Sequence, residues 1–329
     1  MNLSKHMRNK ILFGDCRDTL KQFDEQARTC VTSPPYYGLR DYGGEESQIG
    51  QEQTPEEFIE QLVNVFKEVR NVLTDDGTCW VNLGDSYYNY RPGKGQGLAK
   101  QTVSNTKQDL PDVCPRRGNR LEGLKEKDLI GIPWMFAFAM RADGWYLRQD
   151  IIWHKPNPMP ESVKDRCTKS HEYIFLFSKN KKYFYDNESI KEPAKDWGTR
   201  DRSKGKYHNE GTGLQPHSGL TKSYPTKNKR SVWSVTNKPY REAHFATYPP
   251  DLIEPCILAG SEKGDIILDP FMGSGTTAAV AKSLGRDYIG CELHEKYGDL
   301  IKQRVSEYHV PIEVVSQNGL TDLLDSAIL

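Results

Sequence analysis

A glycine-rich turn between two strand-like segments constrains the fold of this chain more than any other feature. Residues 265–268 are strand-like, with three apolar residues after Asp265, and the turn Asp269-Pro-Phe-Met-Gly-Ser-Gly-Thr-Thr277 follows them directly. The pattern predicts an alanine-rich helix that ends near residue 284, and then a second strand that ends at Glu292. Two strands joined by a helix are typical of parallel pairing in an α/β sheet.

The rest of the chain repeats this alternation of strands and helices. Short apolar runs predict strands, and apolar residues at helical spacing predict helices. The predicted strands are residues 11–13, 28–32, 78–83, 145–153 and 171–177, and the predicted helices are residues 55–73, 132–143 and 251–259. A chain of 329 residues with 36% hydrophobic residues can build one large domain with an insertion. We therefore expect an α/β fold with a mostly parallel sheet.

The glycine-rich turn is suited to a nucleoside cofactor. Gly273 and Gly275 let the backbone approach a ligand, and Glu292 at the end of the next strand suits the hydroxyls of a ribose. The turn lacks the Gly-Lys-Ser/Thr sequence of a triphosphate-binding loop, and Ala278 replaces the third glycine of the dinucleotide fingerprint. S-adenosylmethionine fits better, because it carries no phosphate. Alone, the two glycines would indicate no more than a structural turn.

A second motif, Thr32-Ser-Pro-Pro-Tyr36, comes directly after a predicted strand. Ligand sites of α/β sheets lie beyond the carboxyl ends of strands, so this position is suitable for catalysis. The Ser33 hydroxyl and the Pro34 carbonyl can accept from a base amino group, whose lone pair is otherwise delocalised into the ring. Pro34 and Pro35 stiffen the loop. The Tyr36 ring can stack on a base drawn out of a duplex, with a gain of about 1–3 kcal/mol.

Together, the two motifs resemble those of S-adenosylmethionine-dependent DNA amino-methyltransferases of the beta class, in which the Pro-Pro-Tyr loop precedes the glycine loop. The resemblance spans residues 11 to about 304. It implies a Rossmann-like methyltransferase fold with a mostly parallel seven-stranded sheet and a target-recognition insertion. It also implies catalytic roles for Ser33, Pro34, Pro35 and Tyr36. The cofactor-binding residues that it implies are Asp15, Thr32, Phe245, Thr247, Asp269, Phe271, Gly273, Gly275, Thr276 and Glu292.

The segment Trp153-His-Lys-Pro-Asn-Pro-Met-Pro160, with His171 and Glu172, resembles the loop on the base side of the same family. An ordinary proline-rich turn is the alternative for this segment. Carbon-5 methylation of cytosine needs a cysteine nucleophile in a Pro-Cys context, which Cys114-Pro115 and Cys256 do not provide. Direct transfer of the methyl group, without a covalent enzyme intermediate, is therefore favoured.

The target atom is predicted to be N4 of cytosine, because Ser in the first position of the loop mostly accompanies cytosine in this family. N6 of adenine stays open, since Asp, Asn and Ser can all accept from an N–H. Two readings from other classes also stay open. One is a catalytically inert DNA-binding or specificity subunit, and the other is an RNA methyltransferase.

The stretch 191–241 is the predicted target-recognition region. It holds twelve Lys and Arg against four acidic residues, with five interleaved aromatic side chains. Such a stretch can neutralise phosphates and read bases, although many charge-rich stretches are only solvated insertions. The candidate DNA contacts are Lys204, Lys206, Lys227, Lys229 and Arg230. Residues 84–127 form a second polar, basic loop that could clasp DNA.

These features divide the chain into four parts. Residues 1–190 form the catalytic part, which includes loop 84–127, and residues 191–241 form the recognition region. Residues 242–310 form the cofactor-binding part, and residues 311–329 form a tail. The expected partner is duplex DNA with a specific recognition sequence, together with a cognate restriction endonuclease as a further candidate. The chain is expected to act as a monomer or a homodimer.

Composition sets limits on the compartment and on metal binding. The seven cysteines include no C-x-x-C pair, so neither a disulfide framework nor a zinc site is expected. There is no signal sequence at the first ten residues and no long apolar run. We expect a cytoplasmic protein with no metal and no membrane contact. The formal net charge is zero, and a local basic surface is sufficient to bind DNA.

Overall fold

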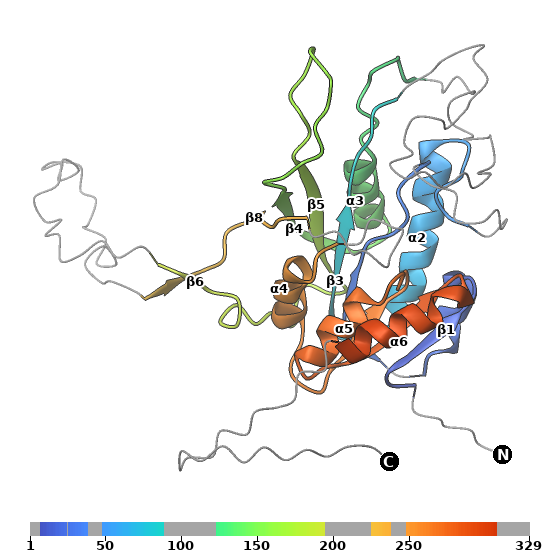
Figure 1. Ribbon diagram of the computed structural model, residues 1–329. Helices are drawn as coiled ribbons and strands as arrows, with labels where there is room; N and C mark the ends of the chain where they lie inside the picture. Colours follow the sequence, from blue (N-terminus) through green and yellow to red (C-terminus); the bar gives the residue numbers. More distant parts are fainter. Residues whose placement is uncertain are drawn as a thin grey trace, which may run out of the picture.

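The computed structural model describes residues 7–24, 26–38, 48–88, 123–194, 225–237 and 248–307. Strands and helices alternate along the chain, as the sequence predicts (Figure 1). In the first half they are β1 (Lys10–Phe13), α1 (Cys16–Thr19), β2 (Ala27–Thr32), α2 (Pro55–Val72), β3 (Leu73–Leu83), α3 (Ile132–Ala142), β4 (Tyr146–His154) and β5 (His171–Ser178). They continue as β6 (Glu192–Pro193), β7 (Thr226–Lys227), β8 (Val232–Ser234), α4 (Pro250–Gly260), β9 (Ile266–Asp269), α5 (Thr276–Ser283), β10 (Asp287–Glu292) and α6 (Gly298–Glu307).

The central sheet has eight strands in the order β1-β10-β9-β2-β3-β5-β4-β8. All neighbours pair in parallel except β5, which is antiparallel to both β3 and β4. The expected mostly parallel α/β sheet is therefore confirmed. It has one strand more than the expected seven, because Val232–Ser234 adds an edge strand along β4. The C-terminal end of the stretch 191–241 thus belongs to the central sheet.

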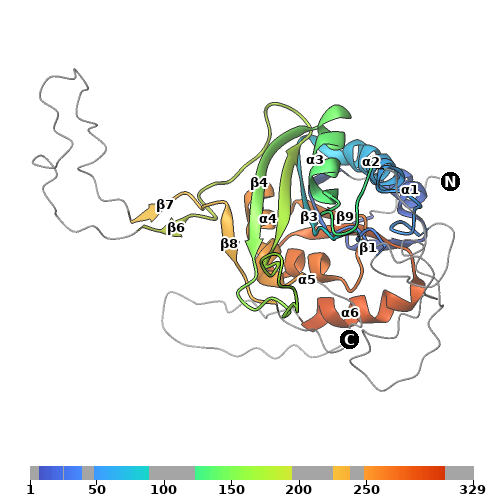
Figure 2. The ribbon, with the colours of Figure 1, turned by 90° about the horizontal axis from the view of Figure 1, so that it is seen from above.

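Helices cover both faces of the sheet (Figure 2). On one face α2 and α3 enclose a core with large buried side chains such as Phe58, Phe66, Phe136 and Phe177. On the other face α4 and α5 pack on a second core that contains Trp80 and Ile257. With both faces covered, the central strands are apolar on both sides, which is why they read as short continuous apolar runs.

Helix α2 begins as its sequence predicts. Thr54 is the N-cap, and its side chain accepts from the backbone N–H of Glu57 at 3.1 Å. The Glu57 carboxylate accepts in return from the Thr54 N–H at 3.2 Å, which completes a capping box. Pro55 occupies the first helical position, where a missing N–H costs nothing. Local sequence therefore fixes the start of the helix whose apolar face shares a core with β2 and β3.

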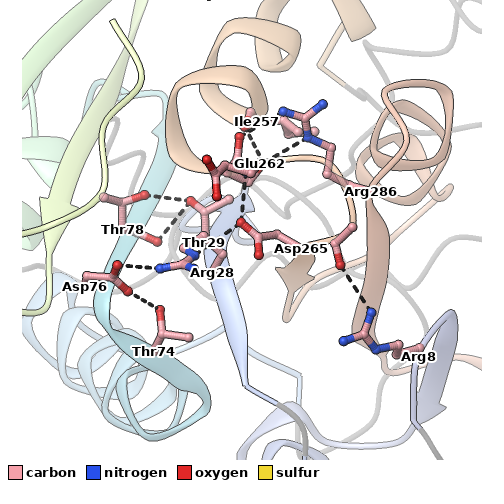
Figure 3. Close-up of polar contacts among 12 residues, drawn as sticks. Arg8, Arg28, Thr29, Thr74, Asp76, Thr78, Ile257, Glu262, Asp265 and Arg286 are labelled. Atoms are coloured by element: carbon pink, nitrogen blue, oxygen red, sulfur yellow. Dashed lines mark hydrogen bonds and ion pairs between the residues drawn. The ribbon is translucent and has the colours of Figure 1, made fainter.

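Polar contacts tie the strands together at the edge where β2 and β9 begin (Figure 3). Arg28 donates to Asp265 at 3.2 Å and forms a second ion pair with Asp76. The Thr29 and Thr78 hydroxyls lie 2.8 Å apart, against Gly260 at the end of α4, where an added Cβ would lie 2.7 Å from the Thr29 hydroxyl. The edge where the parallel strands begin is thus closed by protein contacts.

Across the described ranges, we found no helix with both the length and the apolar character to cross a bilayer. The loop predicted over residues 84–127 is described only at its two ends, and Tyr87 near its start forms an isolated bridge with Leu129, just beyond its end. Residues 195–224, which hold most of the predicted recognition region, lie outside the described residues.

Candidate functional site

The two predicted loops meet at the edge where the parallel strands end. Strands β2 and β9 are parallel neighbours, so their carboxyl ends lie side by side. The Thr32 hydroxyl, at the end of β2, donates to the Asp269 carboxylate, at the end of β9, over 2.6 Å. This bond joins residues that lie 237 positions apart in the chain. The fold therefore brings together the two motifs that the sequence predicts to act together.

Asp269 is buried and is fully engaged by the protein. Besides Thr32, it accepts from the Thr277 hydroxyl at 2.6 Å, the Phe271 N–H at 3.0 Å and the Tyr248 hydroxyl at 3.1 Å. Burial raises the pKa of Asp269, against the hydrogen bonds from Thr277 and Thr32, which lower it. Its carboxylate thus ties the catalytic loop to the glycine loop. Sequence reasoning missed Tyr248, because a single tyrosine before a helix carries no motif.

The glycine loop holds the shape that its sequence predicts. Gly273 and Gly275 have φ values of +56° and +82°, in the region that favours glycine. A Cβ on Gly275 would come within 2.9 Å of Ile301 on α6, so this glycine also lets α6 pack against the loop. Beneath the loop, the buried Arg304 guanidinium donates to the Ser274 hydroxyl at 2.5 Å. Helix α6 is therefore part of the support of the loop.

Glu292 ends β10 beside the glycine loop. Its carboxylate accepts from the Gly273 N–H at 2.8 Å and from the His294 N–H at 3.1 Å. Burial raises its pKa to about 7, since desolvation disfavours the charged form. A Cβ on Gly273 would meet only the Phe271 carbonyl, at 3.8 Å, so the space over this glycine is open. An open glycine next to an acceptor carboxylate fits an adenosyl group with ribose hydroxyls.

Of the other residues predicted to bind the cofactor, three lie among the described residues and two do not. Phe271 and Thr276 lie in the glycine loop and at the start of α5. Asp15 lies just beyond β1, whose end is bonded to β10 through the Gly14 N–H and the Glu292 carbonyl, 2.9 Å apart. Its carboxylate caps α1 and pairs with Arg17, which lowers its pKa despite partial burial. Phe245 and Thr247 lie outside the described residues.

Tyr36, in the loop after β2, is held by residues at the end of β3 and at the start of β5. Its hydroxyl donates to the Glu172 carboxylate at 2.7 Å and lies 3.3 Å from the Asn82 side-chain oxygen. Burial, followed by the nearby Glu172 charge, raises the pKa of Tyr36, so the hydroxyl stays protonated and can donate. The ring also contacts Gly84, where an added Cβ would lie 2.8 Å from Cε2 of Tyr36. The ring is thus fixed at its tip and along its edge.

Glu172 is itself part of a small charged network. Lys155 donates to its other carboxylate oxygen and lies over the Trp153 ring, 4.2 Å from its centroid. The Asn82 amide donates to Glu172 at 3.2 Å. The segment 153–160 and the pair His171-Glu172 were expected on the base side; of these, Glu172 bonds Tyr36 directly and Lys155 pairs with Glu172. Asn82 and Gly84 were not foreseen, although their place at the end of a strand was a usable signal.

Next to Tyr36 in the same loop, Pro34 is buried, and Ser33 and Pro35 are partly exposed. Ser33 is thus accessible at the edge where Asp269 and Tyr36 are anchored. This arrangement offers a hydroxyl acceptor, a backbone carbonyl at Pro34 and a fixed aromatic ring beside the open glycine loop. These are the groups that an amino group on a planar base requires.

Three of the five predicted DNA-contacting residues are described. Lys227 and Arg230 face Glu192, with nitrogen–oxygen distances of 3.9 and 3.0 Å. Lys229 lies over the Trp233 ring, 5.1 Å from its centroid. The Arg230 side chain is nevertheless 73% exposed, so it can still contact a phosphate. Lys204 and Lys206 lie outside the described residues.

A family model and the similar sequences both indicate DNA methyltransferases. A family model described as DNA methylase matches residues 27–303. The chain is 46% identical to the Type II methyltransferase M.SmaI of Serratia marcescens over 297 residues, which is 90% of each chain. It is 45% identical to the Type II methyltransferase M.Cfr9I of Citrobacter freundii over 293 residues, covering 89% of this chain and 86% of that one.

Solved structures share the fold at lower sequence identity. The cytosine-N4-specific PvuII DNA methyltransferase is 18% identical, with a TM-score of 0.56 and coverage of 91% of this chain and 93% of that one. A putative DNA modification methylase of Thermus thermophilus, solved with S-adenosyl-L-methionine, is 22% identical, with a TM-score of 0.54 and coverage of 98% and 100%. Both likenesses concern the fold.

Proposed function

Because the chain belongs to the DNA methylase family of S-adenosylmethionine-dependent enzymes, we propose that it methylates the exocyclic N4 of cytosine at specific sites in duplex DNA. The observation that carries this proposal is the Thr32–Asp269 hydrogen bond, 2.6 Å long, which joins the Ser-Pro-Pro-Tyr loop to the glycine loop. A base held at the first loop and a methyl donor held at the second would lie at one sheet edge.

The proposed binding of the donor uses the glycine loop. S-adenosylmethionine supplies a methyl group on a positively charged sulfur. In its ionised form, Glu292 accepts hydrogen bonds from the ribose hydroxyls, while Gly273 and Gly275 let the backbone lie close to the methionine part. Two side chains hold this loop: Arg304 donates to the Ser274 hydroxyl, and Asp269 accepts from the Phe271 N–H.

The proposed transfer is direct. Ser33 Oγ and the Pro34 carbonyl accept from the target N–H bonds, which favours a pyramidal nitrogen with a freer lone pair. A carbon–nitrogen bond then forms as the carbon–sulfur bond breaks, and the amino group loses one proton to water. Tyr36 stacks on the base, and its hydroxyl stays bonded to Glu172. Stacking worth about 1–3 kcal/mol offsets much of the few kcal/mol that base flipping requires.

The choice of cytosine rests on Ser33, through the family resemblance of its motif. Adenine N6 is the second candidate, since the same acceptors suit either amino group. The relatives named above are Type II methyltransferases, so we further propose that a cognate restriction endonuclease shares the recognition sequence. The basic stretch 191–241 is proposed to recognise that sequence.

One experiment separates these assignments. The protein is incubated with methyl-labelled S-adenosylmethionine and with unmethylated genomic DNA or total RNA, and the nucleic acids are then digested to nucleosides. We expect labelled N4-methylcytosine from duplex DNA and none from RNA. Labelled N6-methyladenine would show that the target base is adenine, and label in RNA alone would show that the substrate is RNA. If no nucleoside is labelled, the proposal that the chain is a methyltransferase is contradicted. Mapping the labelled positions gives the recognition sequence.

A further inference from the structure

The β4–β5 loop, residues 155–170, carries the most exposed large apolar side chain of the described residues. Met159 is 80% exposed, while the next, Val232, is 58% exposed. A single exposed apolar side chain is ordinary on a protein surface, so the rigidity of the loop and its place at the sheet edge have to carry any functional argument about Met159. The support and the position of the loop indicate which partner Met159 contacts.

The loop holds Met159 stiffly. Pro158 and Pro160 flank it, and a residue before a proline is restricted to extended conformations. On one side, Asn157 exchanges hydrogen bonds with the Asn237 backbone, at 3.1 and 3.3 Å. On the other side, Glu161 accepts from Arg166 at 2.7 Å and from the Lys169 N–H at 3.0 Å. The tip is therefore fixed within two residues on each side of Met159.

The base of the loop is a wall of the candidate base site. Lys155 and Glu172 flank the two ends of the loop, and Glu172 holds the Tyr36 hydroxyl. Strand β4 runs in the same direction as β3, because both are antiparallel to β5, so the loop rises from the edge where Tyr36 lies. Met159 follows Lys155 by four residues, which bounds their separation at about 14 Å. The loop that carries the tip thus rises from the same edge of the sheet as the loop that carries Tyr36.

The charge of the loop suits a polyanion. It contains four basic residues, Lys155, Lys164, Arg166 and Lys169, against two acids. Both acids are already paired, Glu161 with Arg166 and Asp165 with Lys127, the latter at 2.7 Å. Arg166 also lies over the Tyr87 ring, 4.0 Å from its centroid, which anchors the loop to the segment after β3. The loop thus presents one apolar tip on a net basic, rigid support.

From these observations we propose that Met159 is a wedge that enters the DNA duplex where the target base leaves it. Proteins that distort DNA insert apolar side chains between base steps, on a support that binds phosphates. A base that leaves the stack for the Tyr36 site leaves a gap, and Met159 fills it and keeps the base from returning. This inference rests on the proposed function and adds a positioning residue to it.

The test compares paired and mispaired targets. Met159→Ala, Met159→Leu and the wild-type chain are assayed on a short duplex that contains the mapped recognition sequence, and on the same duplex with a mismatch at the target base. A mismatched base leaves the stack easily and needs no wedge. We expect Met159→Ala to lose at least about tenfold in kcat/KM on the paired duplex, to stay within about twofold on the mismatch, and to be rescued by Met159→Leu.

Tyr146→Ala is the matched control, because Tyr146 is also exposed but begins β4 at the opposite edge of the sheet. It should leave both rates unchanged. Fluorescence of pyrrolocytosine at the target position, where it still pairs with guanine, gives a second readout, which should rise with the wild type and stay low with Met159→Ala. Calorimetric binding of S-adenosylmethionine should be the same for all variants.

Equal rates for Met159→Ala and the wild type on the paired duplex would overturn the wedge, as would equal losses on both duplexes. In either case a wild type that methylates the paired duplex leaves the proposed function intact. A wild type that labels neither duplex would instead contradict the proposed function itself.

Discussion

Three oxygen-bearing side chains define the site at the scale of single residues. Asp269 accepts from four protein groups, and its hydrogen bonds connect the Ser-Pro-Pro-Tyr loop to the glycine loop. Glu292 accepts from two backbone N–H groups, and it lies beside an open glycine. Tyr36 commits its hydroxyl to Glu172, and its ring is the group proposed to stack on the base. The residues thus differ in which of their groups remain available for ligands.

Removing Glu172 should loosen Tyr36 without disturbing the donor site. In Glu172→Ala the Tyr36 hydroxyl loses its 2.7 Å partner and Lys155 loses its counter-ion. We expect kcat/KM for DNA to fall roughly ten- to a hundredfold, in line with the loss of about 1.4–2.7 kcal/mol of ring positioning. Glu188→Ala, at an exposed glutamate, is the control. Steady-state kinetics and calorimetry check this, and a matching loss of cofactor affinity would count against it.

Cofactor affinity should depend on pH through Glu292. Its pKa is raised to about 7 by burial, and the ionised form is the one that accepts from both ribose hydroxyls. Affinity should therefore be nearly full at about pH 8 and fall, by up to about tenfold per pH unit, as the pH drops below about 7. Glu292→Gln should bind weakly with a flat profile. Calorimetry across this range measures both, and a flat wild-type profile would refute the assignment.

The same shift has the opposite sign for folding. The folded-state pKa of Glu292 lies above its ordinary value of 4.5, so the folded chain binds this proton more tightly than the unfolded chain does. The contribution of this group to stability is full below pH 4.5 and is lost as the pH rises through about 7. Bound cofactor, which needs the charged form, offsets that loss.

At the scale of elements, motif and periodicity predicted most of the architecture. The capping box of α2, the apolar runs of β2 and β9, and the glycine turn each carry a local signal, and all appear in the structure. The eighth strand was missed because three residues in a basic stretch have no periodicity. Tyr248, Asn82 and Gly84 were missed because their roles come from neighbours far away in the chain.

Gly275→Ala tests how α6 packs on the glycine loop. Its positive φ and the 2.9 Å approach of an added Cβ to Ile301 should displace the loop. We expect cofactor affinity to fall at least about tenfold and the melting temperature to drop. Gly264→Ala is the matched control, since Gly264 has a similar φ of +84° but open space around it. That variant should lose about 1–2 kcal/mol of stability and no affinity. Equal affinity losses in both would contradict the packing argument.

At the scale of the whole molecule, the site is assembled from distant parts of the chain. The proposed acceptors at Ser33 and Pro34 come from the first half of the sequence, and Asp269 and Glu292 come from the last quarter. The edge where the parallel strands begin and the edge where they end carry different groups. One is closed by ion pairs such as Arg28–Asp265, and the other holds the two loops and the β4–β5 loop. This division leaves one edge for DNA.

DNA binding should therefore depend on basic residues of the stretch 191–241 more than on basic residues at the opposite edge. Replacing Lys204 and Lys206 together by alanine should weaken duplex binding, and should reduce the slope of log K against log salt by about two. The pair Lys181 and Lys182 is the control, since it follows β5, whose direction carries it to the opposite edge. Anisotropy titrations at several salt concentrations measure both pairs. If the double variant at Lys204 and Lys206 has an unchanged slope of log K against log salt, these two residues do not contact DNA phosphates.

The strand order also determines when the strands can pair as the chain is synthesised. Strands β9 and β10 lie between β1 and β2, so within the described sheet β1 has its partner only after β10 has been synthesised. Strands β2, β3, β5 and β4 can pair earlier, because all four are adjacent in the order of the sheet. A nascent chain therefore carries its Ser-Pro-Pro-Tyr loop long before it has a place for a methyl donor. The two loops can meet at one sheet edge only once β9 has been synthesised and paired with β2.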